Sequence, residues 1–297
     1  RAAIGTLEAL GMCRVHGSDG GDGGQQAACC VFLHLSRLLQ KRAADAAALA
    51  LKHTDGKILA GGQSLVQAMK LRLASPSDII DLGTAKDLVG ITQKGNQITI
   101  GAMTRHAAVE QSAEVKQLIP ALADLAGGIG DRQVRHMGTL GGALANNDPA
   151  ACYPAAVLGL GATIQTNKRT IAADDFFKGL YETALESGEI ITAVTFPAAK
   201  RAAYIKFKTP ASRFALVGVF VAQMDQGVRL AVTGAASCVF RVPEMEKALG
   251  TAFTPEAIAK IHVSADDLNS DLHAAADYRA HLVTVMAKRA VSKALGQ

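Results

Sequence analysis

Apolar residues in the first third of the chain are spaced as in a small α/β unit. Residues 43–53 form an alanine-rich stretch with helical propensity that ends at Thr54-Asp55-Gly56, where a glycine suits a helix C-terminus. Apolar runs over 58–60 and 79–82 are typical of buried strands, and an amphipathic helix is expected over 64–73 between them. A strand, a helix and a second strand in this order predict a small parallel sheet.

Polar turn residues then separate a strand pair from further helices. Lys94-Gly95-Asn96 interrupts two apolar runs, 88–92 and 97–102, and predicts a β-hairpin. Thr104 is placed to cap the helix that follows, and 115–125 carries the apolar stripe of a second helix. The chain then enters a glycine-rich region.

The second half of the chain contains another hairpin and then an antiparallel section. Before Pro197 we expect a short helix over 154–160, a hairpin of 162–166 with 170–172, and a strand over 189–196. After Pro197 we expect antiparallel strands over 204–208, 215–224 and 228–235, and helices from Glu244 onward that include 277–294. This change of pattern places a domain boundary near 198–201.

The composition allows a large core and argues against two classes of partner. With 297 residues, of which 49% are hydrophobic, the chain is long enough for two or three subdomains. The net charge of +5 comes from scattered Lys and Arg, and only 4% of residues are aromatic, so we expect no nucleic-acid binding. No apolar run reaches the ~18–20 residues that a membrane span requires, so we expect no membrane span.

Cysteine and histidine are too dispersed to predict a metal site. The cysteines, at positions 13, 29, 30, 152 and 238, contain no C-x-x-C pair, which indicates reduced thiols in a cytoplasmic protein. Iron–sulfur and zinc sites need clustered ligands, so we assign no metal ligand to this chain. We assign no catalytic residue either, because His136 has no carboxylate partner and no nucleophile motif occurs.

Glycines and polar residues are concentrated between 127 and 164, around Gly138-Thr139-Leu140-Gly141-Gly142. Glycine lets another group approach the main chain closely. Successive free N–H groups around Gly141 and Gly142 would form an anion-binding concavity, to which Thr139 adds a hydroxyl. The alternative is a glycine-rich loop that only turns the chain.

A second glycine loop lies nearer the N-terminus. Gly61-Gly62 separates a short apolar strand from a helix that opens at Ser64, and this is the layout of a phosphate site, because helix-opening N–H groups favour an anion. The stretch is neither a G-x-G-x-x-G fingerprint nor a G-x-x-x-x-G-K-[ST] loop. Two separate glycine loops suit a ligand with a pyrophosphate at its middle.

The two loops carry a family resemblance. A-G-G-Q-S-L at 60–65 followed by M-K-L-R, and T-L-G-G at 139–142 followed by N-D-P and Y-P-A-A, resemble the FAD-binding medium subunit of molybdenum hydroxylases. The flavoprotein subunit of aerobic carbon monoxide dehydrogenase is of this type, and the same module occurs within xanthine dehydrogenase. The resemblance extends from about Ala43 to the C-terminus.

The resemblance implies an α+β fold. Residues 43–199 would form an FAD-binding domain of two α/β subdomains, one with a small parallel sheet and one with a mixed or antiparallel sheet, of the p-cresol methylhydroxylase and vanillyl-alcohol oxidase type. Residues 200–297 would form a C-terminal domain with an antiparallel sheet and helices. Residues 1–42 are atypical for the family, and we interpret them as a divergent extension or a stretch from an altered reading frame. We expect no signal peptide, because an acidic, glycine-rich run precedes the apolar residues.

The resemblance also assigns residues to the cofactor. The two glycine loops would hold the pyrophosphate of FAD and the neighbouring ribityl or ribose groups, and a few polar and strand residues would add contacts. The residues so assigned are Ile58, Leu59, Ala60, Gly61, Gly62, Gln63, Ser64, Leu65, Gly138, Thr139, Leu140, Gly141, Gly142, Ala143, Asn146, Asp148, Ile190 and Ile191.

Each of these assignments has a purely structural alternative. The loops would be two tight turns, the polar pair Asn146 and Asp148 would form an Asx-type turn leading into Pro149, and the two isoleucines would be buried strand residues. Relatives often carry aspartate where this chain has Cys152, and a neutral thiol is a poor acceptor for a sugar hydroxyl.

A segment of the C-terminal domain, 204–218, resembles the part of the family that reaches the isoalloxazine ring. Lys208 would place a positive charge near the N1/O2 edge of the ring, where reduced flavin is negative, or it would be a solvated lysine at a strand end. Phe214 would stack beside the ring, at a position where some relatives have tyrosine, or it would pack in the core.

The function that the resemblance implies is that of an FAD-carrying electron-transfer subunit. It would take electrons from the [2Fe–2S] clusters of a small partner subunit, fed by a large subunit with the molybdenum cofactor, and pass them to a quinone or NAD. The C-terminal domain would be the docking surface, and the three subunits would form a dimer of heterotrimers. One alternative is a self-sufficient FAD oxidase of the vanillyl-alcohol-oxidase type. The other is a cofactor-free scaffold subunit, in which the altered N-terminus has removed the first strand of the parallel sheet.

Overall fold

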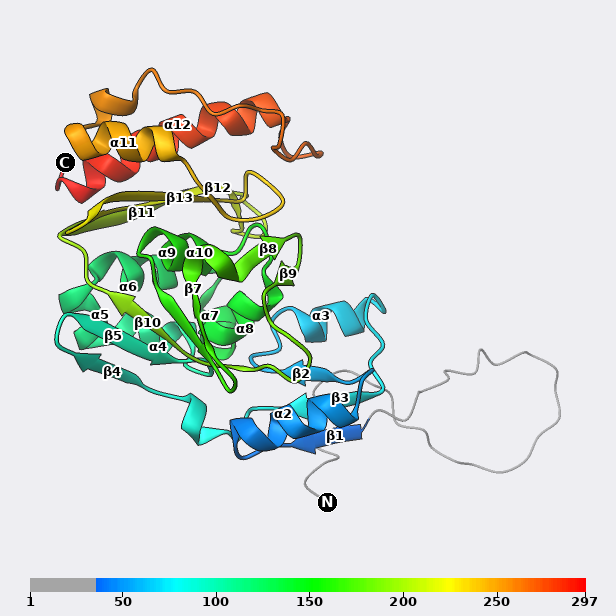
Figure 1. The fold of residues 1–297 in the computed structure, drawn as a ribbon. Coiled ribbons are helices and arrows are strands. Elements are labelled where there is room, and N and C mark those ends of the chain that lie inside the picture. The colour runs from blue at the N-terminus through cyan, green and yellow to red at the C-terminus, as the bar shows by residue number, and fades with distance from the viewer. Residues whose placement is uncertain (1–35) are drawn as a thin grey trace, which may run out of the picture.

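The computed structural model describes residues 36–297, and Figure 1 shows that its three larger sheets follow one another from the N-terminal to the C-terminal end. The expectations for residues 1–35 lie outside the described residues. The α+β class predicted from the sequence is confirmed, because a parallel sheet, antiparallel sheets and packed helices all occur. The division into domains at 199 and 200 stays a prediction.

A parallel sheet of three strands opens the described chain. Its order is β1-β3-β2, with β1 at Ser36–Leu39, β2 at Lys57–Leu59 and β3 at Asp78–Asp81. Helix α2 (Ala43–Lys52) places its buried alanines in a hydrophobic cluster with this sheet. The small parallel unit predicted from the sequence is confirmed.

Strand β1 corrects the expectation for the N-terminal segment. It lies within residues 1–42 and pairs in parallel with β3, from Ser36 opposite Asp78 to Leu39 opposite Asp81. The scaffold alternative assumed that the first strand of this sheet had been lost. That assumption is wrong, because β3 has a parallel partner on each side.

The helix after the first glycine loop is shorter than predicted. Helix α3 covers Leu65–Lys70, whereas the sequence pattern indicated 64–73. Arg72 has a φ of 57°, a left-handed conformation that cannot continue a right-handed helix. The N–H of Leu73 instead donates to the carbonyl of Ala68 at 2.8 Å and closes the turn.

The second sheet is antiparallel and has the order β4-β5-β10-β6-β7. Its two predicted hairpins and its predicted central strand are present. The strand bounds are β4 (Ile91–Lys94), β5 (Gln97–Gly101), β6 (Thr163–Thr166), β7 (Thr170–Ala172) and β10 (Ile191–Pro197). Strand β4 begins later than predicted, because Lys86–Leu88 forms the 3-10 turn η1.

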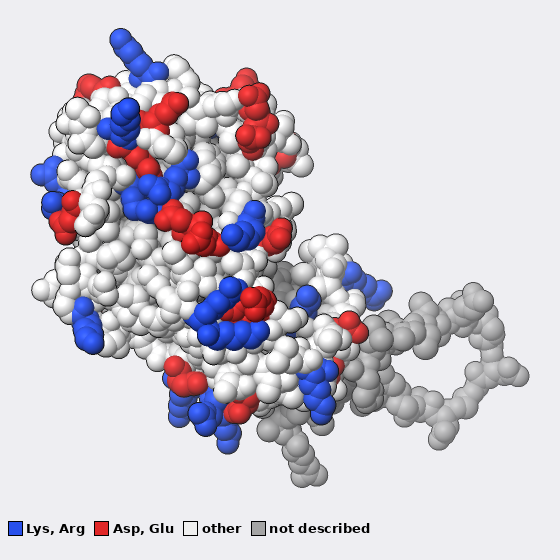
Figure 2. Space-filling view, viewed as in Figure 1, with Lys and Arg blue, Asp and Glu red and all other residues white. Residues whose placement is uncertain are grey.

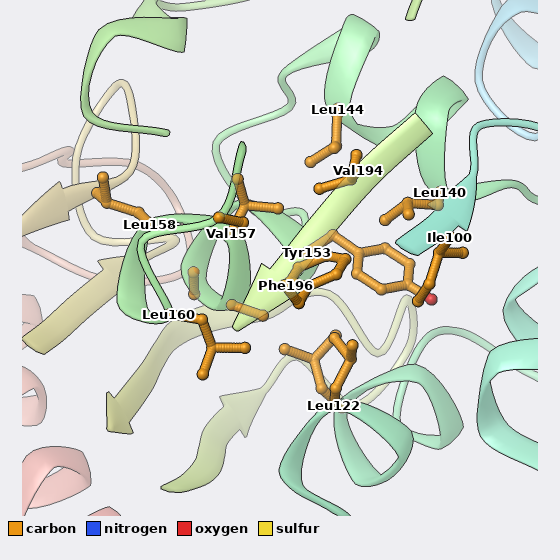
Figure 3. Close-up of a cluster of buried hydrophobic side chains, with 14 of the residues drawn as sticks. Ile100, Leu122, Leu140, Leu144, Tyr153, Val157, Leu158, Leu160, Val194 and Phe196 are labelled. Carbon is orange, nitrogen blue, oxygen red and sulfur yellow. The ribbon is translucent and has the colours of Figure 1, made fainter. Parts of the chain in front are cut away.

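Short helices pack with this sheet in the main hydrophobic cluster. They are α4 (His106–Gln111), α5 (Ala113–Leu118), α6 (Pro120–Gly127), α8 (Leu140–Asn146), α9 (Tyr153–Gly159) and α10 (Ala173–Phe176). Helix α7 (Arg132–Met137) has no buried residue and contacts α4 instead. A small hairpin of β8 (Phe177–Gly179) and β9 (Glu182–Thr183) follows α10. Figure 3 shows Tyr153 and Phe196 near the centre of this cluster, with Leu122 and Leu140 around them.

Two expectations about these helices are wrong. The helix predicted over 115–125 is divided, because Ile119 leaves the helical conformation and Pro120 opens a new helix. Thr104 does not cap α4. Its hydroxyl instead exchanges hydrogen bonds with the backbone N–H and carbonyl of Gly90, both at 3.0 Å.

The C-terminal part is an antiparallel sheet followed by helices, as predicted. The strands run in the order β11 (Arg201–Lys208), β12 (Ala215–Met224), β13 (Gly227–Thr233) and β14 (Phe240–Arg241). The helices are α11 (Pro243–Thr251), the 3-10 turn η2 (Pro255–Ile258) and α12 (Ala276–Ala294), and Figure 1 shows α11 and α12 on one face of the sheet.

Both faces of this sheet are covered. Helix α12 packs on β11 and β12 from one side, and helix α9 packs on β12 and β13 from the other. Phe220 of β12 therefore belongs to the main cluster, whereas its neighbours Val219 and Val221 belong to the C-terminal one. This double burial explains why β12 reads as a continuous apolar run rather than an alternating one.

Charged side chains of both signs are interspersed on the face shown in Figure 2. Two arginines of the C-terminal sheet pair with Asp174 of α10: Arg229 of β13 donates two hydrogen bonds to it, at 2.8 and 2.9 Å, and Arg241 of β14 donates one at 3.2 Å. No helix within residues 36–297 combines the length and the apolar character that crossing a membrane requires.

Candidate functional site

A cavity of about 570 Å³ lies where the two glycine loops meet. Leu59, Ala60, Gly61 and Gly62 line it from the first loop, and Met137 and Thr139 line it from the second, with Arg37, Asp81 and Arg105 around them. This volume is within the ~300–1,000 Å³ that is typical of small-molecule sites. The structure therefore brings the two sequence-predicted loops together at one cavity.

The two loops touch through their backbones, and Gly61 makes this contact possible. A Cβ atom on Gly61 would overlap the carbonyl oxygen of Met137 and lie 2.7 Å from the Cα of Gly138. A Cβ on Gly142 would lie 3.2 Å from that of Ala60. These glycines are required by loop packing, which the sequence reasoning attributed only to the approach of a ligand.

The first loop has backbone donors without a partner among the described residues, and Gly61 and Gly62 of this run line the cavity. None of the backbone N–H groups from Gly61 to Leu65 donates a hydrogen bond to another residue of the described chain. Gly62 adopts a φ of 73°, which favours glycine and turns the chain between strand and helix. A run of free N–H groups in a loop of this kind is suited to the oxygens of a phosphate. The residues present therefore fit a pyrophosphate.

The second loop differs from the expectation. The N–H groups around Gly141 are not free: Leu140 donates to the carbonyl of Thr104 at 3.1 Å, and Gly141 donates to that of Ala102 at 2.7 Å. Gly142 donates to the hydroxyl of Thr139 at 3.2 Å, because Thr139 is the N-cap of α8. The predicted anion-binding concavity at Gly141 and Gly142 is therefore wrong.

Arg37 and Asp81 are cavity residues that the sequence reasoning missed. The Asp81 side chain is buried at the end of β3, where its Oδ2 accepts a hydrogen bond from Nε of Arg37 at 2.8 Å. Its Oδ1 accepts one from the N–H of Gly83 at 2.7 Å. The signal that would have found the pair is an aspartate within a predicted buried strand, because a buried carboxylate needs a partner.

Asp148 forms the Asx-type turn that was its structural alternative. Its Oδ1 accepts a hydrogen bond from the N–H of Ala150 at 2.8 Å. Its neighbour Asn147 was not predicted, yet it is buried, has a φ of 42° and donates from Nδ2 to the carbonyls of Gly179 and Glu182 at 2.8 and 2.7 Å. Asn147 thus ends α8 and holds the hairpin of β8 and β9 in place.

Lys208 and Phe214 lie away from the cavity wall. Lys208 is exposed at the end of β11, and Phe214 is 49% exposed, which excludes core packing as the explanation of Phe214. The lysine that points inward is Lys206, whose Nζ donates to the carbonyls of Gly128 and Arg213, each at 2.8 Å. Sequence alternation along β11 would not distinguish it from Lys208, because both lie on the same face.

The remaining assigned residues divide into two groups. One group belongs to the two loops but lies outside the cavity lining: Ile58, Gln63, Ser64, Leu65, Gly138, Leu140, Gly141, Gly142, Ala143 and Asn146. The other group lies farther along the chain: Asp148, Ile190, Ile191, Lys208 and Phe214. Ile190 and Ile191 are buried, as their structural alternative stated. Their roles toward a cofactor stay predictions.

A buried histidine, His106, packs against Gly138 of the second loop. The Nε2 of His106 would lie 2.6 Å from a Cβ on Gly138, and its ring centroid is 5.2 Å from that of Tyr153. Burial, aided by the positive charge of Arg135, lowers the pKa of His106 to about 4. His106 is therefore neutral near pH 7 and acts as a packing residue.

His136 lies exposed on α7, where its Nδ1 is 2.8 Å from the carbonyl oxygen of Arg132. No carboxylate approaches it within hydrogen-bond distance among residues 36–297. Within the same residues, no group of three or more His, Cys, Asp or Glu side chains is arranged to hold a metal ion.

Comparison with known proteins identifies the family of this chain. Residues 37–199 match the family model of the FAD binding domain in molybdopterin dehydrogenase. The nicotine 6-hydroxylase medium subunit of Paenarthrobacter nicotinovorans is 37% identical, over 84% of this chain and 93% of the relative. The carbon monoxide dehydrogenase medium chain of Afipia carboxidovorans is 36% identical, over 86% and 94%.

The fold agrees with these matches. A solved carbon monoxide dehydrogenase from Hydrogenophaga pseudoflava superposes with a TM-score of 0.81 at 35% identity, covering 89% of this chain and 98% of that one. Family, relatives and fold thus point the same way, as the resemblance of the two glycine loops had predicted. The chain belongs to the FAD-binding medium subunits of the molybdopterin dehydrogenases, which are oxidoreductase subunits.

Proposed function

We propose that this chain binds one FAD at the cavity between its two glycine loops and serves as the electron-transfer subunit of a molybdenum hydroxylase. The observation that carries the proposal is the run of backbone N–H groups from Gly61 to Leu65, which have no partner among residues 36–297 and begin at the two glycines that line the cavity. When bound, FAD supplies the exchange of one or two electrons, and the protein supplies binding and orientation.

Different residues of the chain would bind the cofactor, support the binding loop and exclude water. The N–H groups of the first loop would donate to the pyrophosphate oxygens, and Arg105 adds positive charge to the same cavity, in which Arg37 is paired with Asp81. The second loop supports the first through the contact of Gly61 with Gly138 and through the capped start of α8 at Thr139. The apolar lining, which includes Val66, Met69 and Met103, would exclude water from the cofactor.

The partners follow from the relatives. Those proteins are named medium subunits or medium chains, so we infer a small subunit with [2Fe–2S] clusters and a large subunit with the molybdenum cofactor, assembled as a dimer of heterotrimers. Electrons would leave this chain for a quinone or NAD. Similar proteins are named for substrates as different as nicotine and carbon monoxide, so the large subunit would choose the substrate.

Affinity purification of the tagged chain, followed by flavin, iron and molybdenum analysis, tests this function. We expect FAD in equal amount to the chain, with iron and molybdenum in co-purifying proteins. An assembled complex that contains no flavin would refute the FAD site, and recovery of the chain without either metal would refute the partnership.

Titration of the apo chain with FAD separates the remaining alternatives. Tight binding with a stoichiometry of one eliminates the cofactor-free scaffold. Reduction of the isolated, FAD-loaded chain by a small organic substrate would instead support a self-sufficient oxidase.

A further inference from the structure

A cysteine and a lysine meet where helix α9 faces the C-terminal sheet. The Sγ of Cys152, the residue before α9, lies 3.4 Å from the Nζ of Lys206 on β11. Cys152 is only 6% exposed. The pair is far apart in sequence and belongs to two parts of the fold, so its contact depends on the folded protein.

Backbone groups fix the lysine beside the sulfur. Nζ donates to the carbonyl oxygens of Gly128 and Arg213, each at 2.8 Å. An ammonium group has three hydrogens, so the third is directed at the sulfur. Nζ is thereby held beside one thiol by two separate loops, and this orientation raises the rate of any reaction between the two atoms.

A buried hydroxyl next to the pair lacks a partner. Tyr204, two residues before Lys206, is 6% exposed, and its Oη lies beside Cys152 without a well-aligned hydrogen bond to any described residue. Burial and the neighbouring Cys152 both raise the pKa of this hydroxyl, so Tyr204 keeps its proton and can donate it. A buried polar atom without a partner is rare. Tyr204 is therefore suited to donate to an oxygen atom placed between Cys152 and Lys206.

We propose that Cys152 and Lys206 form a covalent S–O–N bridge when the folded protein reacts with dioxygen. The lysine first releases its extra proton to water. The S–H bond and one N–H bond then break, one oxygen atom forms the S–O and O–N bonds, and the other leaves as water with the two hydrogens. Sulfur and nitrogen lose two electrons each, and dioxygen gains four.

The bridging oxygen fits the pair better than other oxidation products do. A direct S–N bond would require the two atoms to move much closer than an intervening oxygen does. The other described cysteine, Cys238, is also a free thiol, and its Sγ accepts a hydrogen bond from the Nδ2 of Asn147 at 3.6 Å. The bridge would tie α9 to β11 and close a long loop of the chain, which raises the thermal midpoint.

The test uses the complete chain, purified with any subunits that accompany it, in air and under reductant. After proteolysis, mass spectrometry should find the peptides of Cys152 and Lys206 joined, with a mass equal to their sum plus one oxygen less two hydrogens. Trypsin should not cleave after a linked Lys206. Dithiothreitol should restore thiol and amine, oxidising two dithiols and releasing one water per bridge, and lower the thermal midpoint.

Matched variants and an unfolded control make the result specific. Cys152→Ser and Lys206→Arg should abolish the linked peptide, whereas Cys238→Ser and Lys208→Arg should retain it. The comparison of wild-type protein before and after dithiothreitol needs no variant to fold. The proposal is overturned if aerobic protein holds Cys152 only as a thiol, a disulfide or an oxygen acid, or if protein unfolded in urea forms the same link.

Discussion

At the scale of single residues, two glycine loops that looked like ligand contacts turn out to be packed on each other. Gly61 has the carbonyl of Met137 and the Cα of Gly138 where its Cβ would be. Neither backbone atom can move without shifting a loop. We predict that Gly61→Ala costs about 1–3 kcal/mol in the free energy of unfolding through this overlap. It should also weaken FAD binding, as measured by calorimetric titration of the apo chain.

Gly250 provides the matched control for this substitution. It lies in helix α11, where a Cβ would meet nothing within 4 Å. Gly250→Ala should therefore stabilise the protein by about 0.5–1 kcal/mol and leave FAD binding unchanged. Equal effects of the two substitutions on unfolding would show that the loop contact at Gly61 is unimportant.

His106 gives the protein a specific dependence on pH. Its folded-state pKa of about 4 lies below the ordinary value of 6.5, because the ring is buried and Arg135 is near. Between pH 6.5 and about pH 4, His106 therefore binds a proton in the unfolded chain but not in the folded one. Because of this histidine, the free energy of unfolding is highest above pH 6.5 and decreases by about 3 kcal/mol as the pH falls from 6.5 to 4.

Urea unfolding between pH 7 and pH 4 measures this loss. His106→Leu replaces the ring with an apolar side chain that does not titrate, so the slope of unfolding free energy against pH should flatten in this window. Its Nδ1 has no partner within residues 36–297, so the substitution breaks no hydrogen bond made by that atom. An unchanged slope in the variant would mean that other groups cause the acid sensitivity.

At the scale of elements, Glu189 ties the hairpin of β6 and β7 to the chain before β10. Its side chain is fully enclosed and accepts hydrogen bonds from Nε of Arg169 at 3.0 Å and from the hydroxyl of Thr166 at 2.8 Å. These donors, with the N–H of Glu186, lower its pKa to about 2. The stabilisation that Glu189 contributes to the folded state is therefore complete above pH 4.5 and is lost as the pH falls toward 2.

We predict that Glu189→Gln costs about 2 kcal/mol at pH 7, because it removes charged hydrogen bonds in an enclosed site. The difference from wild type in chemical unfolding should shrink as the pH falls from 4.5 toward 2. Glu186→Gln is the control: its side chain is 60% exposed and 3.3 Å from Arg169, so it should cost less than about 1 kcal/mol. Similar losses of unfolding free energy in both variants would contradict a special role for the hydrogen bonds of the enclosed Glu189.

Most elements could be predicted from sequence, and the misses have local causes. Hairpins with glycine or asparagine turns and strands with continuous apolar runs are determined by nearby residues, and they occur as predicted. The prediction of a single helix over 115–125 was wrong. It relied on an apolar stripe that continues across Pro120, but the ring of this proline forces a break in the helix. Thr104 looked like a cap because its role depends on Gly90, which only the folded sheet brings near.

At the scale of the whole molecule, the sequence predicted which loops form the candidate site, but it did not predict which backbone N–H groups in these loops are available to a ligand. The motifs named both glycine loops, and the fold brings them to one cavity. Which N–H groups stay free depends on what packs beside each loop: Ala102 accepts the bond from Gly141, whereas nothing described accepts one from Gly62. Arg37 and Lys206 were missed for the same reason, since their neighbours are distant in sequence.

The C-terminal sheet shares its core with the rest of the protein, so the two parts should unfold together. Phe220 of β12 is fully buried in the main cluster and packs on Gly159 of α9, where a Cβ would lie 2.8 Å from its ring. Phe220→Ala should cost about 3–5 kcal/mol through lost burial and a cavity. Circular dichroism and proteolytic release of fragments from both parts should report one shared, lowered midpoint. Phe207→Ala, on the neighbouring strand and 39% exposed, should shift that midpoint much less. Two separate transitions in the Phe220 variant would mean that residues 37–199 and the C-terminal sheet fold independently.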